Sequence, residues 1–168
     1  NLKKKIAELK KNNKKIVQCH GVFDILHLGH IKHFLEAKKN GDKLIITVTS
    51  DKFVNKGSNR PIFKQNKRIE FLAQLECVDF VCLSNSESSI EMLNIIKPSF
   101  YVKGQDYKDS KNDKTGKIIL EKNIVEKNGG KIVYTNEETF SSSNIINNFS
   151  FDKDQKKYLN QISKKYSF

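Results

Sequence analysis

The chain has 168 residues, of which 37% are hydrophobic and 30% are charged, a composition typical of one folded domain and not of a disordered chain. No apolar run approaches the ~20 residues that a membrane helix needs, so we expect no membrane partner. The formal net charge is +12, but only two of the 31 cations are arginines and the lysines are scattered. That pattern disfavours nucleic-acid binding and favours solvated faces that attract small anions.

Short apolar runs alternate with segments whose apolar residues recur every three or four positions, which predicts strands alternating with helices. We expect strands at residues 15–20, 44–49, 79–83, 99–103 and 131–135. We expect helices at residues 2–13, 28–40, 64–75, 88–97, 116–128, 142–148 and 152–166. Continuously apolar strands joined by helices are typical of a parallel sheet with both faces covered. The sequence therefore predicts an α/β fold, a Rossmann-like parallel sheet of about five strands with helices on both faces.

The chain shows no internal repeat and no Gly- or Ser-rich linker that would divide it. We expect one domain over residues 1–150 and a helical extension over residues 151–168. Three explanations of the extension stay open: it packs on the domain, it mediates self-association as a homodimer, or it leads into a further domain. The first residue is Asn1 and not Met, so we expect a processed or excised chain.

The cysteines are odd in number and lie in apolar runs, at Cys19, Cys77 and Cys82. This pattern predicts buried free thiols in a reducing compartment, and therefore a cytoplasmic location. No C-x-x-C pair occurs, so a structural zinc site is not expected.

All four histidines of the chain fall between residues 20 and 33. This segment begins where the first expected strand ends, at the sheet edge where parallel α/β folds bind ligands. Gly21 permits a tight turn after the strand, and Gly29 removes a side chain at the start of the helix, where a ligand must come close. Since the unpaired N–H groups of a helix N-terminus attract anions, the segment predicts a phosphate site.

His27 and His30 are spaced i and i+3, so both imidazoles point from the helix terminus toward the same space. Two capping or packed histidines are one alternative, but the pair brackets Gly29 at a strand-to-helix turn, which favours phosphate. A metal site formed by His27, His30 and His33 is the other alternative. It is disfavoured because ligands spaced i, i+3 and i+6 drift around a helix, and no carboxylate repeats beside them.

Residues 21–30, Gly-Val-Phe-Asp-Ile-Leu-His-Leu-Gly-His, resemble the signature of the cytidylyltransferase-like nucleotidyltransferases, whose core is His-x-Gly-His. The resemblance covers about residues 15–149. Further blocks resemble the nucleotidyltransferase domain of bacterial ADP-heptose synthases: Gly57-x-x-Arg60-Pro61, the helix around Arg68, residues 75–79 and residues 102–107. Glycerol-3-phosphate cytidylyltransferases fit less well, because they carry an arginine where residues 136–140 are Asn-Glu-Glu-Thr-Phe.

The resemblance implies an enzyme that joins a nucleoside triphosphate to a phosphorylated sugar and releases pyrophosphate. ATP is the favoured triphosphate and CTP stays open, with a sugar phosphate such as heptose 1-phosphate as acceptor and Mg²⁺ as cofactor. It also implies a role in sugar-nucleotide biosynthesis and a fused or partner sugar kinase. The alternatives are a cytidylyltransferase acting on a polyol phosphate such as glycerol 3-phosphate, and a nucleotide-binding module without turnover.

The resemblance further implies roles for single residues. Lys56 would face the phosphates, with a solvated loop lysine as the alternative. Arg60 would bind an anion, with pairing to an aspartate as the alternative. Arg68 would bind an anion or pair with Asp79 or Glu70.

Three sets of site residues follow from these roles. The catalytic residues would be His27, His30 and Lys56, and the substrate-binding residues would be Asp24 and Arg60. The nucleotide-binding residues would be Gly21, Val22, Phe23, Gly29, Lys103, Gly104, Asp106, Ser141, Ser142 and Ser143. Capping is the alternative role for Asp106 and for the serine cluster. The charged loop at residues 105–117 suits a lid over the substrate.

Overall fold

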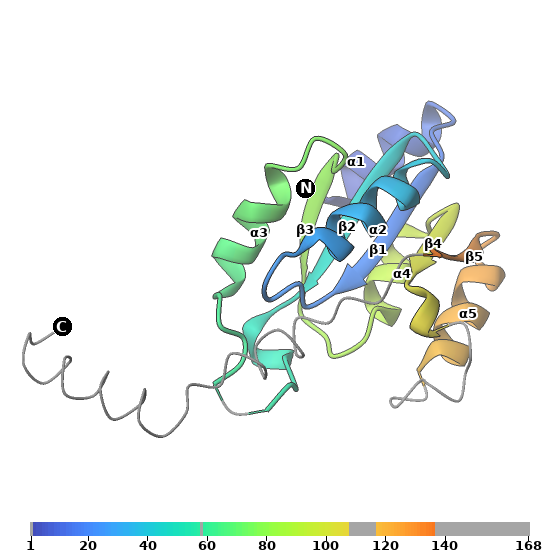
Figure 1. Cartoon of the computed structure of the whole chain (residues 1–168). Coiled ribbons are helices and arrows are strands. Elements are labelled where there is room, and N and C mark those ends of the chain that lie inside the picture. The colour runs from blue at the N-terminus through green and yellow to red at the C-terminus, as the bar shows by residue number, and fades with distance from the viewer. Residues whose placement is uncertain (1, 58, 108–116, 137–168) are drawn as a thin grey trace, which may run out of the picture.

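A computed structural model of the chain describes residues 2–57, 59–107 and 117–136, which form a parallel sheet covered by helices (Figure 1). The sheet has the order β3-β2-β1-β4-β5, and every neighbouring pair is parallel. Its strands are β1 (Ile16–Gly21), β2 (Lys43–Thr49), β3 (Phe80–Ser84), β4 (Phe100–Lys103) and β5 (Lys131–Tyr134). Each strand end falls within one residue of the sequence prediction, so the predicted Rossmann-like α/β class is confirmed.

The helices of the described part of the chain also follow the prediction. They are α1 (Leu2–Lys11), α2 (Leu28–Lys38), α3 (Gln65–Ala73), α4 (Ile90–Ile96) and α5 (Ile118–Lys127). Two single 3₁₀ turns, η1 (Asp51–Phe53) and η2 (Gln105–Tyr107), occupy segments that the sequence leaves irregular. The helices expected at residues 142–148 and 152–166, and the boundary near residue 150, lie outside the described residues.

Two apolar layers hold the helices on opposite faces of the sheet (Figure 1). On one face, Phe34 and Ala37 of α2 and Leu72 of α3 pack against Val17 and other strand residues. On the other face, the apolar residues of α1 and α4 pack against Ile16 and Ile45, and α5 packs beside α4. Neighbouring strand residues thus point to opposite layers, as the pleat requires.

The strand order places a reversal between β1 and β4. The chain moves outward from β1 through β2 to β3, then returns to β4 on the other side of β1. A doubly wound sheet binds ligands at the carboxyl ends of the strands that flank such a reversal. The segment after β1 and the segment after β4 therefore line the candidate site.

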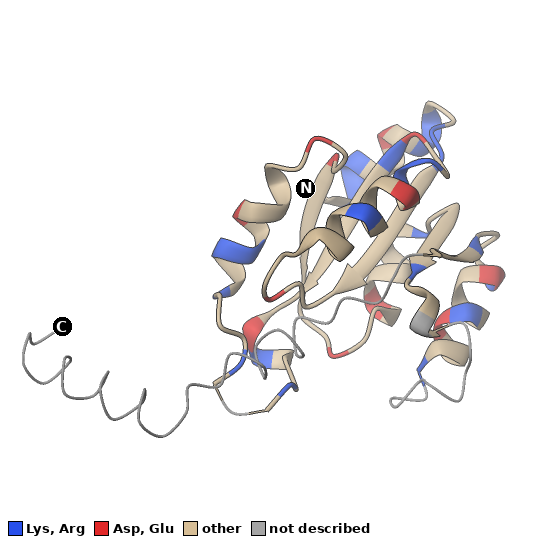
Figure 2. Ribbon diagram, viewed as in Figure 1, with Lys and Arg blue, Asp and Glu red and all other residues tan. Residues whose placement is uncertain are grey.

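The basic side chains are dispersed over the fold. Figure 2 shows Lys and Arg on several helices and on the loop after β2, without one continuous basic face in this view. This distribution agrees with the expectation of solvated lysines. In the described ranges, no helix combines the length and the apolar character that crossing a membrane requires.

The three cysteines are free thiols, as predicted, but only Cys19 is fully buried. Cys77 and Cys82 are half-buried, because they lie next to and within β3 at the edge of the sheet. An edge strand has a neighbour on one side only, so its side chains keep part of their exposure to water.

Candidate active site

The N-terminus of α2 lies directly after β1, at the carboxyl edge of the sheet. His27 is the N-cap residue, with extended backbone angles, and its carbonyl accepts a hydrogen bond from the His30 N–H at 2.9 Å. The first turn of α2, which includes Gly29, carries no acidic residue. The positive end of the helix dipole is therefore not neutralised by its own side chains, which suits an anionic ligand.

The two imidazoles of the His-x-Gly-His segment stack on each other at this terminus. The ring centroids of His27 and His30 are 3.8 Å apart, at an interplanar angle of 29°. Burial lowers the pKa of His27, and it lowers the pKa of His30 to about 3 with help from the neighbouring His27, His33 and Lys56. Both rings are therefore neutral at pH 7 in the free protein, and each keeps one N–H for donation to a phosphate oxygen.

His30 holds a buried polar atom that the protein leaves unsatisfied. Its Nδ1 is buried and has no hydrogen-bond partner in the part of the chain that the structure describes. Such an atom is costly in a folded protein unless a water molecule or a ligand satisfies it. This atom could therefore form a hydrogen bond with a bound ligand.

Phe23 positions His30 by packing edge-on against its ring, with centroids 5.4 Å apart at 79°. The backbone at Phe23 has φ 50°, in the left-handed region that few non-glycine residues adopt. The tight turn predicted at Gly21 thus lies at Phe23 instead. Gly21 serves close packing, because a Cβ atom there would lie 2.9 Å from Cζ of Phe23.

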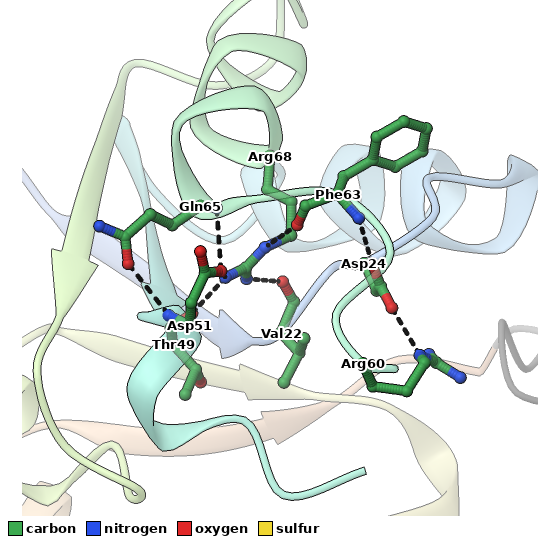
Figure 3. A network of polar contacts seen from close by, with 8 residues as sticks. All are labelled: Val22, Asp24, Thr49, Asp51, Arg60, Phe63, Gln65 and Arg68. Carbon is green, nitrogen blue, oxygen red and sulfur yellow. Dashed lines mark hydrogen bonds and ion pairs between the residues drawn. The ribbon is translucent and has the colours of Figure 1, made fainter. Parts of the chain in front are cut away.

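Asp24 and Arg60 form a buried ion pair, with Nε of Arg60 2.6 Å from Oδ2 of Asp24 (Figure 3). The other carboxylate oxygen accepts the backbone N–H of Phe63 at 3.0 Å. Burial alone would raise the pKa of Asp24, but the N–H groups of Phe63 and Ile62 and the Arg60 guanidinium outweigh it and lower that pKa. Both oxygens of Asp24 therefore already have a donor inside the protein.

Arg60 pairs with an aspartate, the alternative that the sequence left open, and it retains unused donor capacity. Its side chain is 8% exposed, and Nη2 is buried without a hydrogen-bond partner among the described residues. Lys56 lies close to the Arg60 guanidinium. Partial desolvation and the charge of that guanidinium lower the pKa of Lys56, although the residue as a whole is exposed. Lys56 thus lies near both Arg60 and the His30 ring.

Arg68 is fully buried and ties together the chain segments that form the wall of the site (Figure 3). Its guanidinium donates to the carbonyls of Val22, Phe63 and Thr49 and to Oδ1 of Asp51. The predicted pairing of Arg68 with Asp79 or Glu70 is wrong. Those two carboxylates pair with lysines instead, Asp79 with Lys38 and Lys43 and Glu70 with Lys67.

The residues after β4 are only partly placed by the structure. The Lys103 ammonium lies 3.1 Å from Oε2 of Glu121 and 4.1 Å from the Tyr107 ring centroid, so that charge is held inside the protein. The Gly104 carbonyl accepts the Tyr107 N–H at 3.1 Å. The side chain of Asp106, and all of Ser141, Ser142 and Ser143, lie outside the described residues.

The third histidine of the proposed metal set turns away from the other two. Nδ1 of His33 is 3.0 Å from Oγ1 of Thr135, beyond the end of β5. Over the described ranges, no group of three His, Cys, Asp or Glu side chains could hold a metal ion. The donors at the site are imidazoles, cations and backbone N–H groups, which suit phosphate oxygens and not Mg²⁺.

Sequence reasoning missed three contributions to this site. Arg68 was expected to bind an anion or to pair with Asp79 or Glu70, yet it lies one turn before Leu72 on the buried face of α3, a spacing that could have shown its burial. A phenylalanine in the sequence gives no sign that its backbone adopts the left-handed conformation, as that of Phe23 does. The contact between His33 and Thr135 joins residues 102 positions apart, and no local pattern reveals such a pair.

A doubly wound parallel sheet with a stacked His-x-Gly-His pair at the N-terminus of α2 is typical of a Rossmann-like nucleotidyltransferase. A model of the family described as cytidylyltransferase-like matches residues 18–148. The chain belongs to the cytidylyltransferase-like family, and it is a nucleotidyltransferase.

Among curated proteins, the chain is 41% identical over 140 residues to "Bifunctional protein HldE" of Campylobacter jejuni, and 36% identical over 140 residues to that of Geobacter metallireducens. These matches cover 82% of this chain but only 28% and 27% of those proteins. The chain therefore spans little more than a quarter of the length of these relatives.

Two solved structures are also similar to this chain. The lipopolysaccharide core biosynthesis protein of Thermoplasma volcanium superimposes with a TM-score of 0.62 at 30% identity, over 75% of this chain and 99% of that one. Pantoate-beta-alanine ligase of Francisella tularensis superimposes with a TM-score of 0.56 at 20% identity, over 87% of this chain and 71% of that one. The second likeness concerns the fold alone.

Proposed function

We propose that the chain transfers the nucleoside monophosphate of ATP to a sugar phosphate such as heptose 1-phosphate, giving a nucleotide-activated sugar and pyrophosphate. The observation that carries this proposal is the stacked His27–His30 pair at a helix terminus without acidic residues. The resemblance of this sequence to ADP-heptose synthases supports the choice of ATP and of a sugar phosphate.

The reaction needs alignment and charge stabilisation more than it needs a base. An oxygen of the acceptor phosphate attacks the α-phosphorus of ATP, a new P–O bond forms, and the bond from the α-phosphorus to the bridging oxygen of the β-phosphate breaks. The electron pair of that bond leaves with pyrophosphate. The nucleophile is already ionised, so the protein contributes donors that face the α- and β-phosphate oxygens as charge develops on them.

His27 and His30 supply those donors in this proposal. Each neutral ring donates one N–H, and the N–H groups of the first turn of α2 add a fixed positive potential. An anion bound beside His30 raises the pKa of that ring and thereby strengthens its hydrogen bond. Lys56 adds a full positive charge on the pyrophosphate side.

Arg60 fits the acceptor phosphate. Its Nε is held by Asp24 at 2.6 Å, which fixes the orientation of the guanidinium, and its buried Nη2 keeps a donor without a partner in the described ranges. An Arg group in which one edge is fixed presents its remaining donors to a phosphate in a defined direction. Asp24 is then a positioning residue for Arg60.

The nucleoside is proposed to contact the backbone of Gly21, Val22, Phe23 and Gly104, and the side chain of Asp106. Ser141, Ser142 and Ser143 are proposed to bind the β- and γ-phosphates. Because the described site offers no set of oxygen ligands, we propose that Mg²⁺ arrives bound to the triphosphate as part of the substrate. A chelator should therefore abolish turnover without changing the melting temperature of the nucleotide-free protein.

The curated relatives are named bifunctional and extend well beyond the matched region, which supports the proposal of a fused or partner sugar kinase. The deciding experiment measures pyrophosphate release for the four nucleoside triphosphates, each against a panel of sugar and polyol phosphates. Release with ATP and a heptose 1-phosphate supports the proposal. Release with CTP and glycerol 3-phosphate would replace it by the polyol activity, and no release with any pair would contradict the enzymatic function.

A further inference from the structure

One hydrogen bond connects the helix of the two active-site histidines with the opposite half of the sheet. His33 lies one turn after His30 on α2, and its Nδ1 is 3.0 Å from Oγ1 of Thr135, the residue that follows β5. Thr135 is 3% exposed and His33 is half-buried. This polar contact is thus shielded from competition by bulk water, which strengthens it.

Thr135 is in turn tied to the end of β4. Its N–H donates to the Lys103 carbonyl at 3.0 Å, and its hydroxyl lies 3.4 Å from the same oxygen. Nδ1 of His33 donates to Oγ1 of Thr135 in one tautomer of the ring and accepts the hydroxyl hydrogen in the other, so the two residues are hydrogen-bonded in both. Burial and the Lys103 charge lower the pKa of His33 to about 4, so the ring stays neutral at pH 7.

This bond spans the point where the strand order reverses. The apolar residues of α2, Phe34 and Ala37, pack over the β1–β2 half of the sheet. Thr135 and Lys103 belong to the β4–β5 half. One side of the crevice therefore carries the proposed phosphate donors on α2, and the other carries the proposed nucleoside contacts that begin at Lys103.

We infer that His33 and Thr135 are positioning residues that set the spacing between the phosphate-binding end of α2 and the nucleoside-binding end of β4. The inference rests on the proposed function. A whole nucleotide touches both ends, so its affinity depends on that spacing. An inorganic triphosphate touches the α2 end alone, so its affinity does not.

The test compares the dissociation constants of ATP and of inorganic tripolyphosphate by calorimetry in three variants. Thr135→Val removes the hydroxyl and keeps the shape, Thr135→Ser keeps the hydroxyl, and His33→Leu removes the same bond from the other side. Ser89→Ala is the matched control, because it deletes a buried hydroxyl that donates to Glu121 at 2.6 Å and lies at the start of α4, on the other face of the sheet from α2.

Thr135→Val and His33→Leu should each weaken ATP binding about tenfold while changing tripolyphosphate binding less than twofold. Thr135→Ser should retain the wild-type ratio, and Ser89→Ala should lower the melting temperature without changing that ratio. If the folded variants bind ATP and tripolyphosphate equally more weakly, or bind both as tightly as the wild type, the positioning role is overturned and the proposed function is not. A wild-type chain that binds tripolyphosphate but neither ATP nor CTP would overturn the proposed function together with it.

Discussion

The Arg68 guanidinium lies 2.8 Å from the Asp51 carboxylate, measured from Nη2 to Oδ1, and the Arg68 side chain is completely buried. The same guanidinium donates to three backbone carbonyls. The ends of β1 and β2 and the loop before α3 are therefore held together by one side chain (Figure 3). This makes Arg68 a part of the scaffold of the site.

Replacing Arg68 by Met should lower the free energy of unfolding by about 3–5 kcal/mol, because three carbonyls lose a buried donor and the Asp51 carboxylate keeps only the Gln65 N–H and loses its paired charge. Urea denaturation at pH 7 measures this loss. The control is Lys67→Gln, which removes the exposed pair of Lys67 with Glu70 one position earlier on the same helix. That variant should denature at nearly the wild-type urea concentration. Equal stability of the two variants would contradict the role of Arg68.

Gly21→Ala should reduce turnover about tenfold with only a small loss of stability. The added Cβ would lie 2.9 Å from Cζ of Phe23, so the Phe23 ring must shift, and that ring packs edge-on against His30. Displacements near 1 Å in a catalytic group are costly to the rate. Steady-state kinetics and the melting temperature, measured together, separate the two effects.

Gly41→Ala is the control for packing strain away from the site. A Cβ atom there would lie 2.8 Å from the backbone oxygen of Lys15, at the opposite edge of the sheet. This variant should lose about 1–3 kcal/mol of stability and keep its turnover once folded. The account of Gly21 is contradicted if Gly41→Ala loses turnover and Gly21→Ala does not.

The fold should lose stability as the pH falls from about 6.5 toward about 4. Burial lowers the pKa of His20 to about 4, of His30 to about 3 and of His33 to about 4. In this window the unfolded chain binds protons at these rings and the folded chain does not, so acid favours unfolding. Each ring contributes at most about 1.4 kcal/mol per pH unit.

Urea denaturation at pH 7, 6 and 5 measures this dependence. His33→Asn removes one of these titrating rings, so the free energy of unfolding of that variant should depend less steeply on pH than that of the wild type. A stability that is flat between pH 7 and 5, or that rises as the pH falls, would show that these histidines are not neutral in the folded state.

The order of elements was predictable because continuous apolar runs and helical periodicity are local properties of the sequence. The His27–His30 pair was predictable for a similar reason, since residues three positions apart on a helix are neighbours. The partners of Asp24 and Arg68 were not predictable, because their contacts join segments that approach only after the loop between β2 and α3 folds back. Sequence spacing shows that Arg60 is close to a motif, but not that it turns toward Asp24.

Lys56→Gln should lower kcat/KM for the triphosphate about tenfold, as expected for the loss of one charge-assisted contact with phosphate. Lys5→Gln is the control, because Lys5 lies on α1 in an exposed pair with Glu8, before the first strand. It should leave turnover unchanged. If Lys5 proved necessary and Lys56 dispensable, the placement of the site at the carboxyl edge of the sheet would be wrong.

The central claim, that His27 and His30 stabilise the charge that develops during nucleotidyl transfer, is tested most directly by pyrophosphate release from ATP and heptose 1-phosphate in the His30→Ala variant. The Nδ1 atom of His30 has no hydrogen-bond partner in the described structure, so its removal costs only the packing of the ring against Phe23 and His27. We predict a variant that still folds, with a turnover lower by ~10²–10³. A variant that folds and releases pyrophosphate at the wild-type rate would contradict the account.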